Sequence, residues 1–182
     1  MNYLIVILWK LFAKVGKALI KVVIDTNVML PMLYSPKSIE VSSSRKIYDL
    51  LISEQIDAYS CDIFYGETLR IATSDPKLRK VKAEYFNSRV DELFNHINNV
   101  RMDDVNKHKI SINWFPDIKY NVNENDIYLA VVAELTKSKY IITQDQGFTD
   151  AYNDTFPNKN AYACSPRKFI SLEKFFNYQQ HI

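Results

Sequence analysis

Four carboxylates stand where distant parts of an α/β chain can meet. Asp25 ends one apolar run and Asp145 follows another, while Glu67 and Asp126 lie in or before expected helices. Several carboxylates in one cleft repel each other, so their pKa values rise unless a cation is present. A hard divalent metal such as Mg²⁺ accepts oxygen ligands, produces hydroxide from bound water and neutralises charge on a phosphate. The four acids together therefore indicate metal-dependent phosphodiester hydrolysis.

Each acid also has a plainer explanation when it is considered alone. Asp25 and Asp145 suit the turns that follow strands, and Asp126 suits a helix cap. Glu67 suits a solvated helix face. The functional interpretation depends on all four being placed at strand edges.

An alternation of strands and helices supplies those edges. The apolar run Lys21-Val-Val-Ile-Asp25 is typical of a strand buried on both faces. Ligands of such α/β proteins bind beyond the carboxyl ends of parallel strands. We expect an α/β fold with a central, mainly parallel sheet flanked by helices. Strands are expected at 21–25, 57–60, 139–143 and 160–164, helices at 42–54, 61–74, 77–97, 126–137 and from 166, and mostly loop at 98–123.

Composition limits the other functions. The 182 residues suit one domain. The glycine-rich phosphate-binding motifs G-x-x-x-x-G-K-[ST] and G-x-G-x-x-G are both absent from the sequence. The net charge is +2, but residues 1–21 carry four lysines and no acid, which leaves −2 for the rest. Bulk charge therefore does not indicate a nucleic-acid binder. Cys61 and Cys164 form no metal-binding pair, and we interpret them as reduced thiols of a cytoplasmic protein.

Residues 1–20 form a separate unit before the domain expected at 21–182. The apolar run 3–9 is too short to span a bilayer and is a poor signal peptide. Lysines at 10, 14, 17 and 21 share one helical face, which predicts an extra N-terminal basic amphipathic helix. Such a helix could lie on an anionic membrane or dock on a partner. It could equally pack on its own domain or be an extension from an early start codon.

Several motifs resemble PIN domains. Val22-Val-Ile-Asp-Thr-Asn-Val28 is similar to the opening strand of that family. Asp126-Ile-Tyr-Leu-Ala130, Tyr140-Ile-Ile-Thr-Gln-Asp145 and Phe148 resemble its second half, and Ser165 to Phe169 resembles its closing helix start. The stretch Arg70 to Lys80 is similar to a subgroup of toxins from toxin–antitoxin pairs. The resemblance covers about residues 21–175.

The resemblance implies roles for particular residues. Asp25, Glu67, Asp126 and Asp145 would be the catalytic ligands of Mg²⁺ or Mn²⁺. Asn27 would orient Asp25, and Thr143 would act in the same way near Asp145. Gly147 departs from the family, because many members carry a further acid there. This departure puts a second metal in doubt, although Asn123 or Glu124 could supply an oxygen.

Basic and aromatic side chains are candidates for holding RNA. Phosphates could be bound by Arg70, Lys77, Arg79, Lys80 and Lys82. Phe64 and Tyr65 could stack on unpaired bases. A solvated helix face and a core phenylalanine are the alternatives. His96 and His108 have no possible catalytic partner at a characteristic spacing in the sequence, and we expect them to be surface or loop residues.

The favoured function is an endoribonuclease acting on single-stranded RNA. The resemblance implies an antitoxin partner and a homodimer. A PIN-like RNA- or protein-binding module whose catalysis has lapsed is the main alternative, and Gly147 leaves room for it. A membrane-associated interaction protein is a third. A phosphotransferase fits less well because Asn27 stands where that chemistry usually needs an acid, and a DNA 5′-nuclease generally needs a longer chain.

Overall fold

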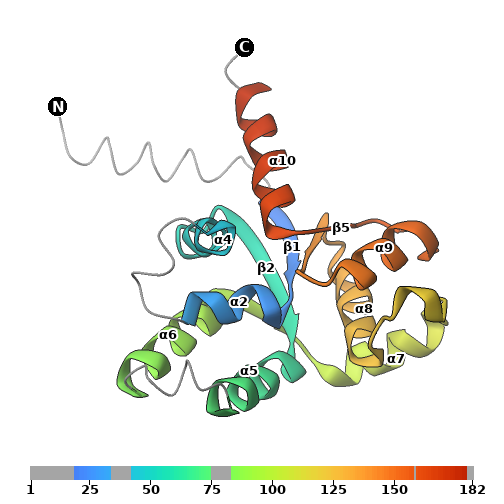
Figure 1. Cartoon of the computed structure of the whole chain (residues 1–182), viewed down its shortest axis with the longest axis horizontal. Helices are drawn as coiled ribbons and strands as arrows, with labels where there is room; N and C mark the ends of the chain where they lie inside the picture. Colours follow the sequence, from blue (N-terminus) through green and yellow to red (C-terminus); the bar gives the residue numbers. More distant parts are fainter. Residues whose placement is uncertain (1–18, 34–41, 75–82, 158, 180–182) are drawn as a thin grey trace.

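The structure is a computed structural model that describes residues 19–33, 42–74, 83–157 and 159–179 (Figure 1). The predictions for the N-terminal helix, Lys77, Arg79, Lys80 and Lys82 lie outside these residues. So do the side chains of Phe64 and Tyr65. The division at residue 20 stays a prediction, and β1 begins at Ile20.

Within the described residues, five parallel strands form one sheet in the order β3-β2-β1-β4-β5. The strands are β1 (Ile20–Ile24), β2 (Ile56–Cys61), β3 (Ile97–Val100), β4 (Tyr140–Ile142) and β5 (Tyr162–Cys164). The apolar run predicted as a buried strand is the central one, and Val22, Val23 and Ile24 are fully buried. The α/β prediction is confirmed, and every strand pair in the sheet is parallel.

Helices cover both faces of the sheet (Figure 1). Because successive side chains of a strand point to opposite faces, Val22 and Ile24 join one core cluster and Val23 joins the other. The first cluster includes residues of α2 (Thr26–Leu33), α4 (Ser43–Ile52), α6 (Ala83–Asn95) and α10 (Pro166–Gln179). The second includes residues of α7 (Met102–Ile112), α8 (Ile127–Thr136) and α9 (Gln146–Thr155). The helix α5 (Asp62–Ser74) follows β2 directly.

The prediction of mostly loop at 98–123 is wrong. That stretch contains most of β3, all of α7 and the short 3₁₀ helix η2 (Ile118–Tyr120). β3 is an edge strand whose Asn98 and Asn99 are exposed, so it lacks the apolar pattern of a central strand. The helix α7 buries only Val105, which leaves little periodic signal.

Helices α2 and α9 were not predicted. Pro31 lies inside the eight-residue α2, and a proline normally lowers helix propensity. The other expected elements occur within a few residues of their predicted limits, except that the predicted start of the helix at 77–97 lies outside the described residues. None of the described helices is long and apolar enough to cross a membrane.

Candidate active site

Asp25 is the most deeply placed of the four acids. It directly follows β1, and its N–H donates to the Ile142 carbonyl of β4 at 3.0 Å. Its side chain is 5% exposed, and burial is the main cause that raises its pKa from 3.8 to about 6. The charge of Glu67 raises the pKa further, whereas hydrogen bonds from Thr143 and from backbone N–H groups lower it. The fold therefore holds a carboxylate whose charge is poorly compensated by the protein alone.

Thr143 ties the ends of β1 and β4 together. Its buried hydroxyl donates to Asp25 Oδ2 at 2.6 Å and accepts from the Asp145 N–H at 3.0 Å. Asn27 Nδ2 donates to the same hydroxyl at 3.2 Å, and Asn27 Oδ1 accepts from the Gln144 N–H at 3.0 Å. Asn27 itself bonds the Asp25 carboxylate through its backbone N–H. The Asn27 side chain thus acts on Asp25 through Thr143.

Glu67 reaches the site from α5. Its Oε2 accepts from the Thr26 hydroxyl at 2.9 Å, and its Oε1 lies 3.9 Å from Arg70 Nη2. Thr26 is buried and directly follows Asp25 in the chain, so the segment that carries Asp25 also holds Glu67. Sequence reasoning missed Thr26, although its place between Asp25 and Asn27 was a signal.

Asp126 is held at the edge of the sheet by a short 3₁₀ helix. This helix is η3 (Glu124–Asp126), which the Asn123 side chain caps by accepting from the Asn125 N–H. The Asp126 side chain makes no cap of its own on α8. Burial and then the charges of the other three acids raise its pKa to about 6. The four carboxylates are therefore close enough to interact electrostatically.

Asp145 also has a structural role. It is the N-cap of α9, where its Oδ1 accepts from the Phe148 N–H at 2.8 Å. The plainer explanation from the sequence is therefore partly right, since the residue shapes the chain after β4. That cap engages one carboxylate oxygen with the first turn of α9.

The acids share a region without forming a compact cage. Among the described residues, no three Asp, Glu, His or Cys side chains are close enough to be a ready-made metal cluster. The donor chemistry nevertheless suits a hard divalent cation, because all four groups are carboxylates. Asp25 and Asp126 would also lose an unfavourable interaction if positive charge were bound nearby.

Gly147 stands where the resemblance leads one to expect a further acid. A Cβ at this position would lie 2.2 Å from the Tyr120 carbonyl oxygen and 3.3 Å from Asp145 Oδ1. Since real atoms do not approach so closely, any side chain here would require the Tyr120 backbone to shift. Of the two suggested substitutes, Asn123 is occupied as a cap and Glu124 is exposed.

Tyr128 is a second residue that sequence reasoning missed. It lies in the first turn of α8, two positions after Asp126, and its side chain is 6% exposed. Burial raises its pKa, and the charges of Glu67 and Asp25 raise it further. The phenol therefore stays protonated beside the acids. The signal in the sequence was the phenol of this tyrosine, which stands in the otherwise aliphatic first half of α8.

Arg70 is the one predicted RNA-binding residue that the structure describes. It is exposed and lines a hollow of about 320 Å³ with Ile63, Gly66, Glu67 and Asn125. Glu67 and Asn125 bring this hollow directly to the acids. The position fits a phosphate contact beside the carboxylates.

Parallel strands, helices on both faces and acids at the carboxyl edge define an α/β protein with an acidic, cation-suited site. Residues 21–147 match a family model described as PIN domain. The match covers most of the chain, which therefore belongs to the PIN-domain family. PIN domains are generally nucleases and generally use divalent metal ions.

Solved structures share this fold. VapBC2 of Rickettsia felis, bound to a promoter DNA fragment, aligns with a TM-score of 0.54 and 13% identity, covering 80% of this chain and 98% of that chain. PAE2754 of Pyrobaculum aerophilum aligns with a TM-score of 0.53 and 12% identity, covering 84% of this chain and 93% of that chain. VapBC-1 of nontypeable Haemophilus influenzae aligns with a TM-score of 0.50 and 15% identity, covering 81% of this chain and 99% of that chain. None of the curated proteins compared with the chain is similar enough in sequence to count as a relative.

Proposed function

We propose that this protein is an endoribonuclease that hydrolyses single-stranded RNA with a divalent metal, Mg²⁺ or Mn²⁺. One observation carries the proposal. Four acids from separate parts of the chain interact at one sheet edge, where burial and then the charges of the other three raise the pKa of Asp126. Asp25, Glu67, Asp126 and Asp145 are the proposed ligands.

The chain's own residues prepare the site for this chemistry. When bound, the metal would supply hydroxide from water and stabilise charge on the scissile phosphate. Thr143 and Thr26 hold Asp25 and Glu67 in place, and Asn27 fixes Thr143. Such supporting hydrogen bonds orient carboxylates before a ligand arrives. Arg70 would hold an adjacent phosphate through its exposed guanidinium.

The partners belong to the same proposal. The names of two of the structural neighbours are those of VapBC proteins, so we propose a toxin role for this chain with an antitoxin protein as inhibitor. A homodimer in the cytoplasm is the expected form. Membrane contact through residues 1–20 stays a prediction that a liposome pelleting assay, with and without those residues, would test.

A binding module with lapsed catalysis is the second candidate. The described acids form no ready-made metal cluster, and both Glu67 oxygens already face protein donors, Thr26 and Arg70. The side-chain space at Gly147 is also closed. These features favour binding without cleavage if the acids do not gather around a cation.

The decisive experiment is cleavage of mixed single-stranded RNA by purified protein with Mn²⁺. Asp25→Asn and an EDTA reaction serve as controls. Cleavage that requires both the metal and Asp25 supports the nuclease. An inert wild type that still binds RNA would support the lapsed module instead.

A further inference from the structure

The segment that connects α7 to η3, residues 113–123, is fixed to α9 at two points. Trp114 is buried, its indole N–H donates to Thr155 Oγ1 at 3.0 Å, and its ring packs edge-on against Phe156. Tyr120 donates its hydroxyl to Asp154 at 3.2 Å and places its carbonyl over Gly147. We call residues 113–123 the connecting segment. Its backbone is held by side chains before and after its centre.

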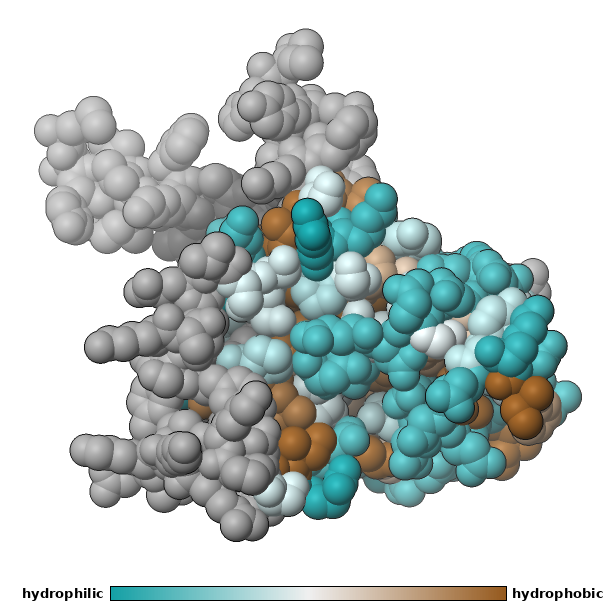
Figure 2. Space-filling view, viewed as in Figure 1, coloured by the Kyte–Doolittle hydropathy of each residue, from teal (hydrophilic) through white to brown (hydrophobic). Residues whose placement is uncertain are grey.

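Large apolar side chains nevertheless point away from this fixed segment. Phe115 is 80% exposed and Ile118 is 94% exposed, and Ile110 on the neighbouring α7 is 82% exposed. Apolar surface is visible at the right of the molecule, over α7 and the segment that follows it (Figure 2). Single exposed apolar residues are common on protein surfaces, so the case for a binding site depends on what these side chains surround.

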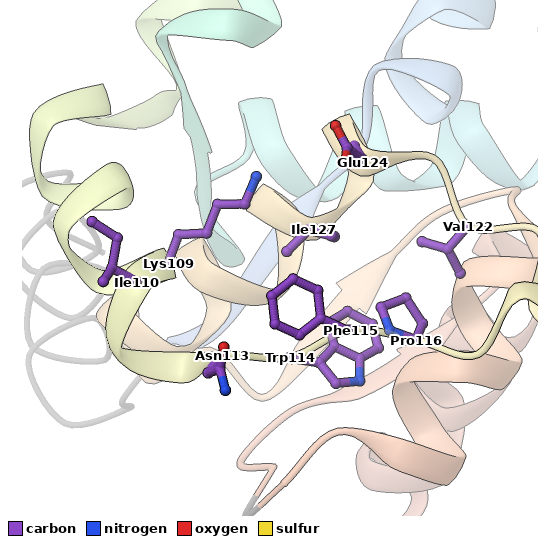
Figure 3. A pocket seen from close by; sticks show the side chains of 9 residues that line it. All are labelled: Lys109, Ile110, Asn113, Trp114, Phe115, Pro116, Val122, Glu124 and Ile127. Atoms are coloured by element: carbon purple, nitrogen blue, oxygen red, sulfur yellow. The ribbon is translucent and has the colours of Figure 1, made fainter.

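Phe115 forms a wall of a cavity of about 510 Å³, which is within the usual size range of ligand sites. Ile110 and Asn113 line it from the end of α7, and Ile127 lines it from α8. Figure 3 shows Lys109 extending from α7 toward Glu124, while the rings of Trp114, Phe115 and Pro116 are grouped nearby. The cavity thus offers an aromatic face, a cation, an amide and the carboxylate of Glu124. Ile118 is not among its lining residues.

The cavity adjoins the acids. Glu124 and Ile127 line it, and these residues flank Asp126 in the chain. Asn125, between them, lines the separate hollow that contains Arg70. The η3 helix that carries Asp126 therefore borders one hollow through Asn125 and the other through Glu124. A strand with its phosphodiester at the acids would have neighbouring nucleotides within reach of both.

Charge distinguishes this cavity from a purely apolar groove. Lys109 is exposed and, within the described part of the chain, has no carboxylate within ion-pair distance. A cation beside an aromatic face suits a nucleotide, whose base stacks while its phosphate takes the positive charge. Asn113 can pair with polar groups on a base edge.

We propose that this cavity is a nucleobase subsite for single-stranded RNA. A base next to the scissile phosphate stacks on Phe115, and Lys109 binds a phosphate that flanks it. This inference rests on the proposed function and deepens it, because it names the unpaired nucleotide as the element recognised. A protein partner on the same apolar face is the rival outcome.

The test measures RNA binding separately from cleavage. The probe is a short, fluorescein-labelled single-stranded RNA of mixed sequence, titrated with the full chain in Ca²⁺, and its integrity is checked after each titration. The variants are Phe115→Ala, which removes the ring, and Phe115→Trp, which keeps a stacking surface. Ile118→Ala is the matched control, since it removes an equally exposed apolar side chain outside the cavity. Lys109→Gln tests the phosphate contact through the dependence of affinity on salt.

Loss of one base stack is worth about 1–3 kcal/mol, so Phe115→Ala should weaken binding about 5- to 140-fold. Phe115→Trp and Ile118→Ala should bind like the wild type, and Lys109→Gln should reduce the salt slope by about one. In cleavage assays Phe115→Ala should raise KM more than it lowers kcat.

Equal RNA affinity of Phe115→Ala and the wild type would overturn the subsite, as would equal losses in Phe115→Ala and Ile118→Ala. Unchanged RNA binding with altered self-association of Phe115→Ala in sedimentation would assign this face to protein contacts and overturn it as well. If the subsite fails while the wild type still cleaves RNA, the proposed nuclease stands. A wild type that neither binds nor cleaves RNA contradicts both.

Discussion

Replacing Asp25 with asparagine removes a buried charge for which the protein alone compensates poorly. Asp25 is 5% exposed, and its pKa rises from 3.8 to about 6, mainly through burial. Asparagine has nearly the same shape but does not ionise, so Asp25→Asn isolates the effect of the charge. The measurement requires EDTA, because a bound cation would offset that charge.

The size and sign follow from linkage between protonation and folding. A rise from 3.8 to about 6 corresponds to about 3 kcal/mol, at 1.36 kcal/mol per pH unit. Since the folded pKa lies above the unfolded one, this carboxyl makes wild-type stability fall as pH rises from about 4 to about 6. Asp25→Asn lacks this loss. The free energy of unfolding of Asp25→Asn minus that of the wild type should be up to about 3 kcal/mol higher at about pH 8 than at about pH 4.

The assay is urea denaturation of both proteins at the two pH values. Comparing the two pH values cancels any constant loss from hydrogen bonds that asparagine disturbs. Asp150→Asn, an exposed change on α9, controls for the removal of a surface charge. If Asp25→Asn shifts stability equally at both pH values, the account of an unfavourable buried charge is refuted.

Other perturbations test neighbouring parts of the site. Thr143→Val keeps the volume but removes the hydroxyl that contacts Asp25, Asn27 and the Asp145 N–H. We expect about 2–3 kcal/mol less unfolding free energy and about 10- to 100-fold weaker Mn²⁺ binding by calorimetry. Unchanged metal affinity would remove Thr143 from the positioning role. Gly147→Ala should lower stability by about 1–3 kcal/mol in urea, because the methyl group meets the Tyr120 carbonyl. If Gly147→Ala were as stable as the wild type, the Tyr120 backbone would move aside at little cost. Mn²⁺ should raise the thermal midpoint at about pH 8 and much less at about pH 4, since Asp25 and Asp126 protonate below about 6. Equal shifts at both pH values would place the metal elsewhere.

The central fold was predictable because burial leaves a clear pattern in the sequence. Val22, Val23 and Ile24 form a continuous apolar run, as a strand buried on both faces requires. Acids at or just past the ends of parallel strands lie at one sheet edge, so the location of Asp25 and Asp145 followed from topology. Edge strand β3 and helix α7 left weak patterns because they bury few side chains.

The finer geometry of the site depends on contacts between residues far apart in the chain. Thr26 to Glu67 spans 41 positions, and Asn27 to Thr143 spans 116. No local pattern specifies such partners. The resemblance implied that Asn27 orients Asp25 and that Thr143 acts near Asp145, whereas the structure places the Thr143 hydroxyl between the Asn27 and Asp25 side chains. The cap formed by Asp145 likewise depends on α9, which had no clear signal.

The connecting segment links the position of the missing acid to the cavity. The Tyr120 carbonyl oxygen of this segment lies where a Cβ at Gly147 would project, and Phe115 of the same segment lines the cavity. Trp114 and Tyr120 hold the segment on α9, so its backbone cannot leave Gly147 without moving Phe115. An acid at position 147 would therefore require the Tyr120 backbone to shift, in the same segment that carries Phe115. In the proposed subsite, the segment whose backbone lies against Gly147 also carries the ring that stacks on a base.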